Sequence, residues 1–155
     1  MIPSRRTAIT QLAAFGAAAL ASVALPSRVI AAPTRATLYK NPQCDCCEGY
    51  AAYLRQNGFE IEVKPTNDLA EISRKAGVPE ELEGCHTMFV GDYVVDGHVP
   101  VKVVRRLLSE RPAIAGITLP GMPTGSPGMS GKKTGPFKIY AVSKDGTAPK
   151  IYAVV

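Results

Sequence analysis

The sequence predicts an α/β fold that starts with a parallel strand-helix-strand unit. Three observations indicate this unit: a short strand pattern at 36–40, apolar residues at helical spacing over 46–56, and an alternating strand pattern at 59–63. Asn57-Gly58 ends the helix. Because a helix joining two strands must cover one face of their sheet, a right-handed parallel crossover is expected.

Three further elements follow this unit. Asp68 and Glu71 form a capping-box pattern that opens a helix ending at Gly77. A two-residue turn predicts a hairpin over 86–95, and Pro100 opens an amphipathic helix that stops before Pro112. The order βαβ-α-ββα, with cysteines between the first strand and the first helix, predicts a thioredoxin-like fold.

The C-terminal third has a different composition. Gly, Pro, Ser and Met dominate 117–134, which predicts an irregular loop. Strand patterns at 137–142 and 150–155 predict a C-terminal β-hairpin.

The N-terminus predicts an export signal. Arg5 and Arg6 form a basic region, and 8–25 is rich in Ala and Leu but too interrupted by polar residues for a membrane span. Cleavage after Ala31 leaves 155 − 31 = 124 residues. Sec and twin-arginine export both fit. A periplasmic protein without stable membrane insertion is expected. The predicted parts are a signal peptide at 1–31, a thioredoxin-like domain at 36–112, a Gly/Pro/Met-rich loop at 113–136, and a β-hairpin at 137–155 packed on the same domain.

The charge argues against nucleic acid as a partner. The formal charge of +5 falls to about +2 when Arg5, Arg6 and Arg28 leave with the signal. The remaining acids and bases are interspersed and form no basic stripe.

The cysteines carry the strongest functional signal. Cys44, Cys46 and Cys47 stand together before the first helix, and a bridge between the adjacent Cys46 and Cys47 would be strained. Such crowding suits metal binding or thiol exchange. A helix N-terminus stabilises thiolates through its unpaired N–H groups and its dipole.

Cys85 should approach this cluster, because the start of the third strand faces the first helix's N-terminus in a thioredoxin-like sheet. A fourth sulfur there completes either a metal site or a second disulfide. Thioredoxin-type oxidoreductases place a proline just before this strand, whereas the segment 84–88 has none. This difference favours metal binding over dithiol exchange.

Soft thiolate and thioether ligands favour Cu(I). Three ligands so close in sequence favour a multinuclear cluster over a single zinc ion, which stays the alternative metal. His86 fits a ligand or a hydrogen-bonded structural residue equally, and His98 is interpreted as a turn residue. The candidate ligands are Cys44, Cys46, Cys47, Cys85, His86, Met122 and Met129.

Four separated motifs resemble the CopG-like metal-binding proteins, a family long catalogued as a domain of unknown function. The motifs are YKNPQCDCC at 39–47, GCHTM at 84–88, VDGHVP at 95–100 and PGMPTGSPGM at 120–129. The resemblance implies a periplasmic thioredoxin-like protein associated with copper resistance. It implies Cu(I) binding through the C-x-C-C cysteines and Cys85.

Two hypotheses follow. The first is a copper-binding protein that sequesters Cu(I) or passes it to other periplasmic copper-handling proteins. The second is an envelope thiol-disulfide oxidoreductase that uses Cys44 and Cys47, with or without coupling to copper redox chemistry. Whether the protein is an enzyme stays open between them.

Overall fold

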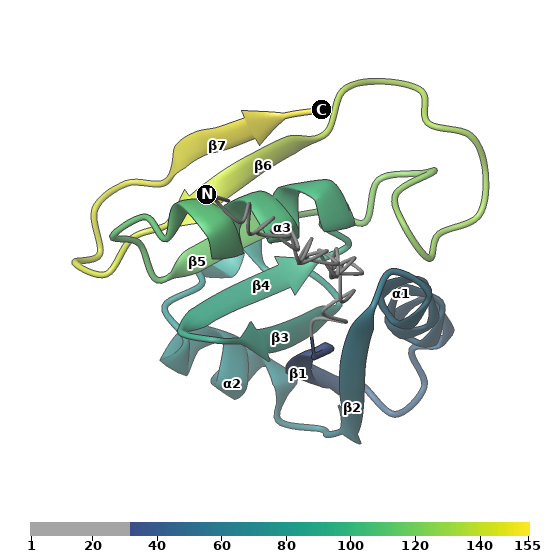
Figure 1. Ribbon diagram of the computed structural model, residues 1–155. Coiled ribbons are helices and arrows are strands. Elements are labelled where there is room, and N and C mark those ends of the chain that lie inside the picture. Colours follow the sequence, from purple (N-terminus) through teal and green to yellow (C-terminus); the bar gives the residue numbers. More distant parts are fainter. Residues whose placement is uncertain (1–31) are drawn as a thin grey trace, which may run out of the picture. The chain divides into compact units, whose positions relative to one another are not determined.

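A computed structural model describes residues 32–155, which form one seven-stranded mixed sheet with helices against it (Figure 1). The expected signal peptide lies outside the described residues. Within them, no helix has the length and apolar character needed to cross a membrane. The elements in chain order are β1 (Thr34–Lys40), α1 (Asp45–Gln56), β2 (Phe59–Pro65), α2 (Leu69–Lys75), the 3-10 turn η1 (Glu80–Leu82), β3 (His86–Val90), β4 (Tyr93–Gly97), α3 (Val101–Glu110), β5 (Gly116–Leu119), β6 (Lys138–Val142) and β7 (Lys150–Val154).

The strands are ordered β2-β1-β3-β4-β5-β6-β7 across the sheet. β1 pairs parallel with β2 and antiparallel with β3, and β3 and β4 form an antiparallel hairpin. The predicted parallel unit and both predicted hairpins are therefore confirmed, and the C-terminal hairpin extends the same sheet.

β5 corrects the prediction of an irregular loop from Ile117. This strand pairs parallel with β4 and antiparallel with β6, and its Ile117 and Leu119 are buried. Gly116 packs so closely on the Val94 backbone that a Cβ would overlap it. The prediction was wrong at this end because four strand residues next to a Gly/Pro-rich segment are too few to show alternation.

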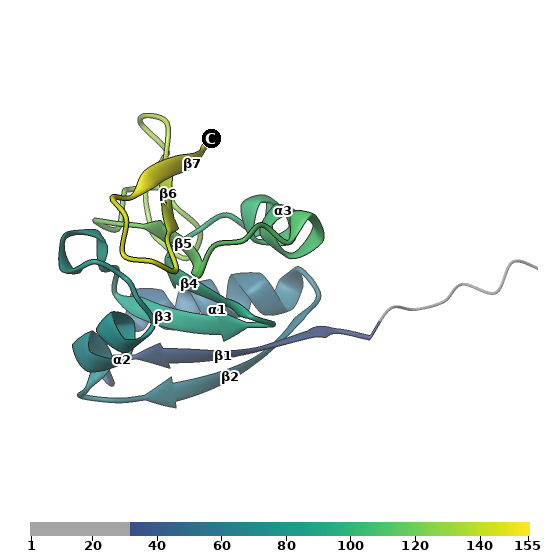
Figure 2. The ribbon, with the colours of Figure 1, turned by 90° about the vertical axis from the view of Figure 1, so that its left-hand side faces the viewer.

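The helices cover both faces of the sheet. Successive strand residues point to opposite faces, and in β4 Val95 joins the core beneath α1 and α3, whereas Val94 packs with Val78 and Val142 on the other face. Figure 2 shows α2 and α3 on opposite sides of the sheet. The largest fully buried apolar side chains are Tyr50, Leu38, Leu54, Met88, Leu107, Ile117 and Ile139.

α2 begins where the sequence predicts, but without the predicted capping box. Asp68 is the residue before the helix, and its side chain makes no capping hydrogen bond. Its backbone, at φ −101° and ψ 25°, is not in the extended conformation that suits a capping side chain. Its N–H instead donates to Thr66 Oγ1 at 3.0 Å.

The contact between β4 and β5 can be tested at Gly97. Gly97 has a left-handed φ of 70°, and a Cβ there would overlap the carbonyl oxygen of Leu119. We expect Gly97→Ala to lower the free energy of unfolding, measured by urea denaturation, by about 3 kcal/mol, from backbone strain and overpacking together.

Gly146 provides the matched control. It has a similar φ of 72°, but no atom lies within 4 Å of its Cβ position. Gly146→Ala should therefore cost only the backbone strain, about 1 kcal/mol. Equal losses in the two variants would contradict close packing between β4 and β5.

Candidate metal centre

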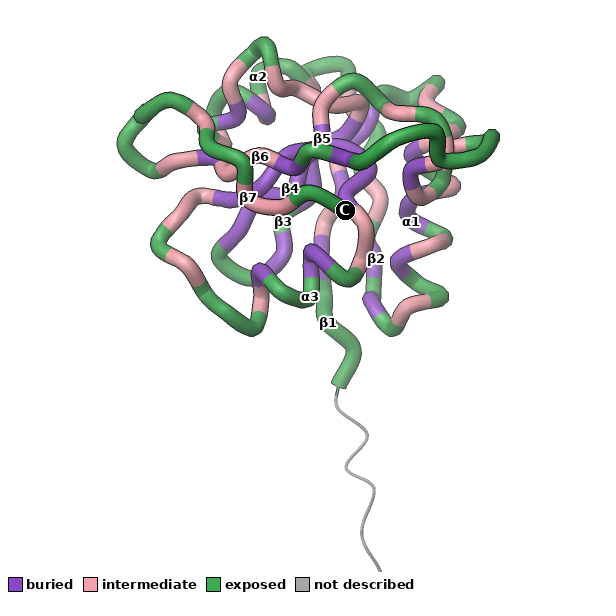
Figure 3. The backbone as a smooth tube through the Cα atoms, turned by 90° about the horizontal axis from the view of Figure 1, so that it is seen from above, coloured by how far each residue is buried: buried purple, intermediate pink, exposed green. Residues whose placement is uncertain are grey.

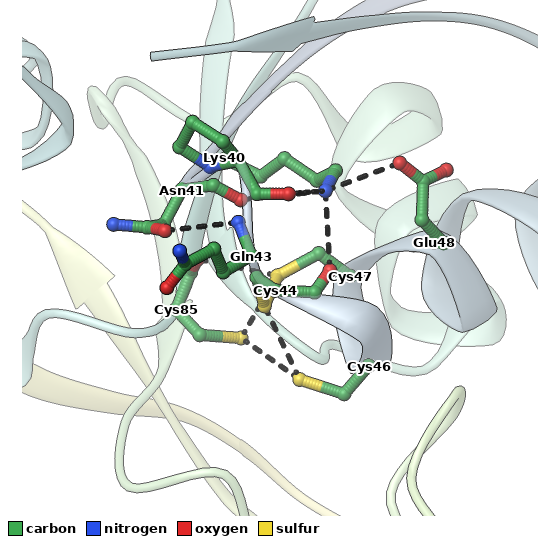
Figure 4. A network of polar contacts seen from close by, with 9 residues as sticks. Lys40, Asn41, Gln43, Cys44, Cys46, Cys47, Glu48 and Cys85 are labelled. Carbon is green, nitrogen blue, oxygen red and sulfur yellow. Dashed lines mark hydrogen bonds and ion pairs between the residues drawn. A yellow bond between two sulfur atoms is a disulfide. The ribbon is translucent and has the colours of Figure 1, made fainter. Parts of the chain in front are cut away.

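The four cysteines converge where α1 begins (Figure 4). Cys44 directly precedes the helix, Cys46 and Cys47 lie in its first turn, and Cys85 directly precedes β3. Their four sulfurs lie within 4.8 Å of one another. The predicted approach of Cys85 to the cluster is confirmed.

Sheet pairing explains this convergence. β1 and β3 are antiparallel, and their register places Lys40, the last residue of β1, opposite His86, the first residue of β3. The chain leaves β1 through a short turn and starts α1 at Asp45. The turn and the residue before β3 therefore meet at one end of the sheet.

The sulfurs comprise one disulfide and two thiols. Cys44 and Cys47 are joined by a disulfide, whereas Cys46 and Cys85 are free. Cys46 Sγ lies 3.4 Å from Cys44 Sγ and 3.8 Å from Cys85 Sγ. Cys47 Sγ lies 3.5 Å from Cys85 Sγ. A disulfide touched by two thiols is arranged for thiol-disulfide exchange, and its reduction provides four thiol groups at one place.

Two histidines extend the cluster into the protein. His98 Nε2 lies 2.9 Å from Cys85 Sγ, and His98 Nδ1 lies 2.6 Å from the carbonyl oxygen of Pro127. A carbonyl only accepts hydrogen bonds, so the Nδ1 atom carries the proton and the Nε2 lone pair faces Cys85. His86 Nδ1 lies 3.5 Å from the same sulfur. The ligand atoms of Cys47, Cys85, His86 and His98 form a second group within 4.8 Å.

His86 also shows that the site is suited to a further ligand. Its side chain is fully buried, and its Nε2 atom has no hydrogen-bond partner among the described residues. The ring packs on Tyr50, with ring centroids 4.6 Å apart, and Tyr50 is anchored by a 2.8 Å hydrogen bond from its hydroxyl to the carbonyl of Val99. An unpaired nitrogen on a buried ring whose other nitrogen lies 3.5 Å from Cys85 Sγ fits a metal site better than a structural core.

Burial keeps these groups neutral at neutral pH. Burial, with a smaller effect from His98, lowers the pKa of His86 to about 3. Burial also lowers the pKa of His98. Burial, and then Cys46, raise the pKa of the Cys85 thiol to about 12. Cys85 and His98 therefore meet as a thiol and a neutral imidazole, and an incoming metal ion must displace the thiol proton.

A buried lysine organises the turn before α1. Lys40 is only 3% exposed, and its ammonium donates to the carbonyl oxygens of Asn41 and Pro42 at 3.3 Å each and of Cys44 at 3.2 Å. It also pairs with Glu48 at 3.1 Å, as Figure 4 shows. One cation thus joins β1, the turn and α1, and fixes the backbone that carries the first cysteine.

A buried carboxylate fixes the segment that carries Cys85. Asp96 Oδ1 accepts a hydrogen bond from the N–H of Gly84, and Oδ2 accepts one from Thr87 Oγ1 at 2.8 Å. Thr87 Oγ1 in turn lies 2.6 Å from the hydroxyl oxygen of Ser73 on α2. This chain of hydrogen bonds holds the residue before Cys85 against β4.

The loop between β5 and β6 covers the start of α1. The backbone of Gly128 packs on Gly49 so closely that neither glycine could carry a Cβ without displacement. Met129 is half-buried and follows Pro127 by two residues, whereas Met122 is 43% exposed with a left-handed φ of 46°. A ligand role for these two methionines stays a prediction.

His98 is the site residue that the sequence analysis missed, because its Asp-Gly-His context suggested a turn. The predicted hairpin contained the missing signal. Its register pairs Val90 with Tyr93 and Thr87 with Asp96. Continued by two residues, the same register places Cys85 opposite His98.

The fold and the site together define a mixed α/β protein with a cysteine-histidine cluster able to hold a metal.

Comparison with known proteins agrees with this class. Residues 82–129 match the family described as "Protein of unknown function, DUF411". Two solved structures are similar, both of copper resistance protein CopG, in forms 1 and 2. Each is 29% identical, covers 79% of this chain and 98% of that chain, and has a TM-score of 0.73. No curated protein sequence matches significantly. Residues 82–129 are thus similar to the DUF411 family, and the resemblance to CopG inferred from the motifs is confirmed.

The Asp96 network gives the metal-free protein a measurable pH dependence. Burial raises the pKa of Asp96 to about 6 from an ordinary value of 3.8. A raised pKa favours the folded state below pH 4, and this stability is lost as the pH rises through 6. We expect the loss to be about 3 kcal/mol, from 1.36 kcal/mol per pKa unit.

Asp96→Asn removes this titration and keeps an acceptor for the Gly84 N–H. The difference in stability between wild type and variant, measured by urea denaturation from pH 4 to pH 7.5, should therefore change by about 2.5 kcal/mol in the variant's favour as pH rises, because part of the effect already lies below pH 4. His86 has the opposite pH dependence, but it is common to both proteins and cancels. A constant difference across this range would contradict an Asp96 carboxyl buried as described.

Proposed function

We propose that this protein binds Cu(I) through Cys44, Cys46, Cys47 and Cys85, and sequesters or transfers it as part of copper resistance. The observation that carries the proposal is the convergence of four sulfurs within 4.8 Å of one another beside the His98 imidazole. Thiolates are the ligands that Cu(I) prefers. The similarity to copper resistance protein CopG supports the same metal.

The donor arrangement favours more than one copper ion per chain. Two groups of potential ligands overlap: the four cysteines form one, and the two histidines with Cys47 and Cys85 form the other. Sulfurs common to two groups are suited to bridging metal ions. The second group is also a Cys2His2 set of the kind that binds zinc, so zinc is the competing metal.

The redox state of the site controls its capacity. The disulfide between Cys44 and Cys47 makes two of the four sulfurs unable to bind metal as thiolates. Reduction, with two electrons and two protons, converts it to two thiols and completes the set. Copper uptake should therefore depend on prior reduction of this bond.

The number of copper ions per chain tests the proposal. We expect reduced protein to bind more than one Cu(I), measured anaerobically by competition with a chromophoric Cu(I) chelator. Cys46→Ser should lose most of this capacity, because Cys46 contacts two other sulfurs of the cluster.

Oxidised wild-type protein is the matched control, because its chain is identical and two of its sulfurs are blocked. It should bind less copper than the reduced form. A stoichiometry of one or less in the reduced protein, or an unchanged stoichiometry in Cys46→Ser, would contradict a thiolate cluster. Metal analysis of protein isolated anaerobically from copper-fed cells distinguishes copper from zinc.

A thiol-disulfide oxidoreductase is the second candidate function. One observation favours it: the disulfide spans the first turn of α1, with the free thiol of Cys46 3.4 Å from Cys44 Sγ. Under this alternative, metal-free protein catalyses insulin reduction by dithiothreitol, and Cys44→Ser abolishes the activity. Under the copper proposal, wild type and Cys44→Ser both give the uncatalysed rate.

We also propose a thioredoxin-like fold for residues 36–112 and a periplasmic location. The order β2-β1-β3-β4, with β1 and β2 parallel and joined through α1, supports the fold. The basic and Ala-rich leader at 1–31 supports export by the Sec or twin-arginine route. Other periplasmic copper-handling proteins are the proposed recipients of the metal.

A further inference from the structure

A groove of about 590 Å³ lies between α3 and β7, the last strand of the sheet. Its apolar lining comes from Val103 and from Ala153–Val155, and its α3 side carries Lys102 and Arg105. Figure 3 shows β7 in the colours of exposed and half-buried residues, in contrast to the buried central strands. The groove therefore combines an apolar lining, a basic side and a sheet edge.

The two edges of the sheet differ in how they are protected. β2 alternates exposed glutamates with buried residues and ends in Lys64-Pro65, and such charges and proline discourage pairing with another strand. β7 instead presents Ile151 and Val154, each 55% exposed, followed by the exposed Val155. These are three of the five large apolar side chains exposed within residues 32–155. Their concentration on one edge marks an interaction surface.

The backbone of this edge is also available. Phe137 and Val155 exchange both of their backbone hydrogen bonds, at 2.7 and 3.1 Å. By the alternation of an antiparallel ladder, the N–H and C=O of Val154 point away from β6. The register skips Tyr152, which forms a bulge. The bulge limits regular pairing with a further strand to the segment Ala153–Val155, which borders the groove.

Charge decides what can occupy the groove. Lys102 forms no ion pair with any residue of the described part of the chain, and Arg105 donates only to the backbone carbonyl of Asn57. Arg106 is already paired with Glu110 at 2.9 Å. Two cationic side chains therefore stay without an anionic partner, and an acidic occupant complements them.

Two other occupants fit less well. A second copy paired through β7 about a twofold axis would place both α3 helices on the same face of the joined sheet, with their basic side chains facing each other. The chain's own residues 1–31 contain Arg5, Arg6 and Arg28 but no Asp or Glu. Neither β7 of a second copy nor residues 1–31 contain an Asp or Glu that could meet Lys102 and Arg105.

We propose that this groove docks an extended segment of another protein in which apolar residues alternate with Asp or Glu. The segment pairs with the backbone of Val154, as in β-strand addition. Because successive strand residues point to opposite faces, its carboxylates lie on the α3 side and meet Lys102 and Arg105, and its apolar side chains lie on the other face beside Val154. Since α3 begins three residues after His98, the docked partner contacts the helix that follows the candidate metal centre.

Peptide binding tests the proposal. The protein is purified from cells that express the full chain, and no metal is added. The probe is a fluorescein-labelled eight-residue peptide of alternating valine and glutamate, followed by fluorescence anisotropy at low salt. We expect saturable binding, which is lost when lysine replaces glutamate in the peptide. N-methylation of alternate peptide nitrogens should also abolish it, because pairing with Val154 needs backbone donors.

Lys102→Glu should weaken binding of the acidic peptide at least tenfold. Lys144→Glu is the matched control: it makes the same charge change in the exposed loop between β6 and β7, and should leave the affinity unchanged. Equal binding of acidic and basic peptides, or equal affinities for the two variants, overturns the proposal. A dimer in analytical ultracentrifugation that Val154→Lys dissociates also overturns it, because the occupant is then a second copy.

Discussion

The hydrogen bonds of the His98 imidazole are the interaction on which the site depends. One ring nitrogen binds the Pro127 carbonyl at 2.6 Å and the other faces Cys85 Sγ at 2.9 Å. The ring therefore joins three segments far apart in the chain: the residue before β3, the end of β4 and the loop after β5. The carbonyl fixes the tautomer, and the tautomer leaves an unprotonated nitrogen facing the cysteine-histidine cluster that is able to hold a metal.

Two buried charged side chains prepare the rest of the cluster. Lys40 satisfies carbonyl groups of the turn before Cys44, and Asp96 satisfies the N–H of Gly84 before Cys85. Both sit at strand ends and both act on backbone rather than on sulfur. Burying a charge is costly, and these contacts offset only part of that cost while they hold two separate segments in position. Hydrogen bonds of the protein itself thus fix the two segments that carry Cys44 and Cys85.

The sequence predicted the elements with strong periodicity and the convergence of the cysteines. The parallel unit and the two hairpins followed from apolar spacing and short turns, and Cys85 was placed at the cluster from the expected sheet. β5 was not predicted because its four residues adjoin a Gly/Pro-rich segment. The predicted capping box at Asp68 was wrong because backbone conformation, and not residue type alone, decides whether the side chain can reach the free N–H groups of the helix. The contact of His98 with Cys85 depends on the register of the hairpin, and its contact with Pro127 depends on the position of a backbone carbonyl. The pattern of side chains along the sequence does not predict where that carbonyl lies.

The facing glycines at 49 and 128 determine which parts of the loop can vary. The acceptor for His98 belongs to the main chain, so the imidazole recognises the path of the loop and not the side chain at position 127. That path depends on two residues without a Cβ, one on α1 and one in the loop. A single methyl group on the helix surface would push the loop outward and take the carbonyl with it. The chemical state of a buried imidazole is therefore controlled by a steric requirement at a position that contains no functional group.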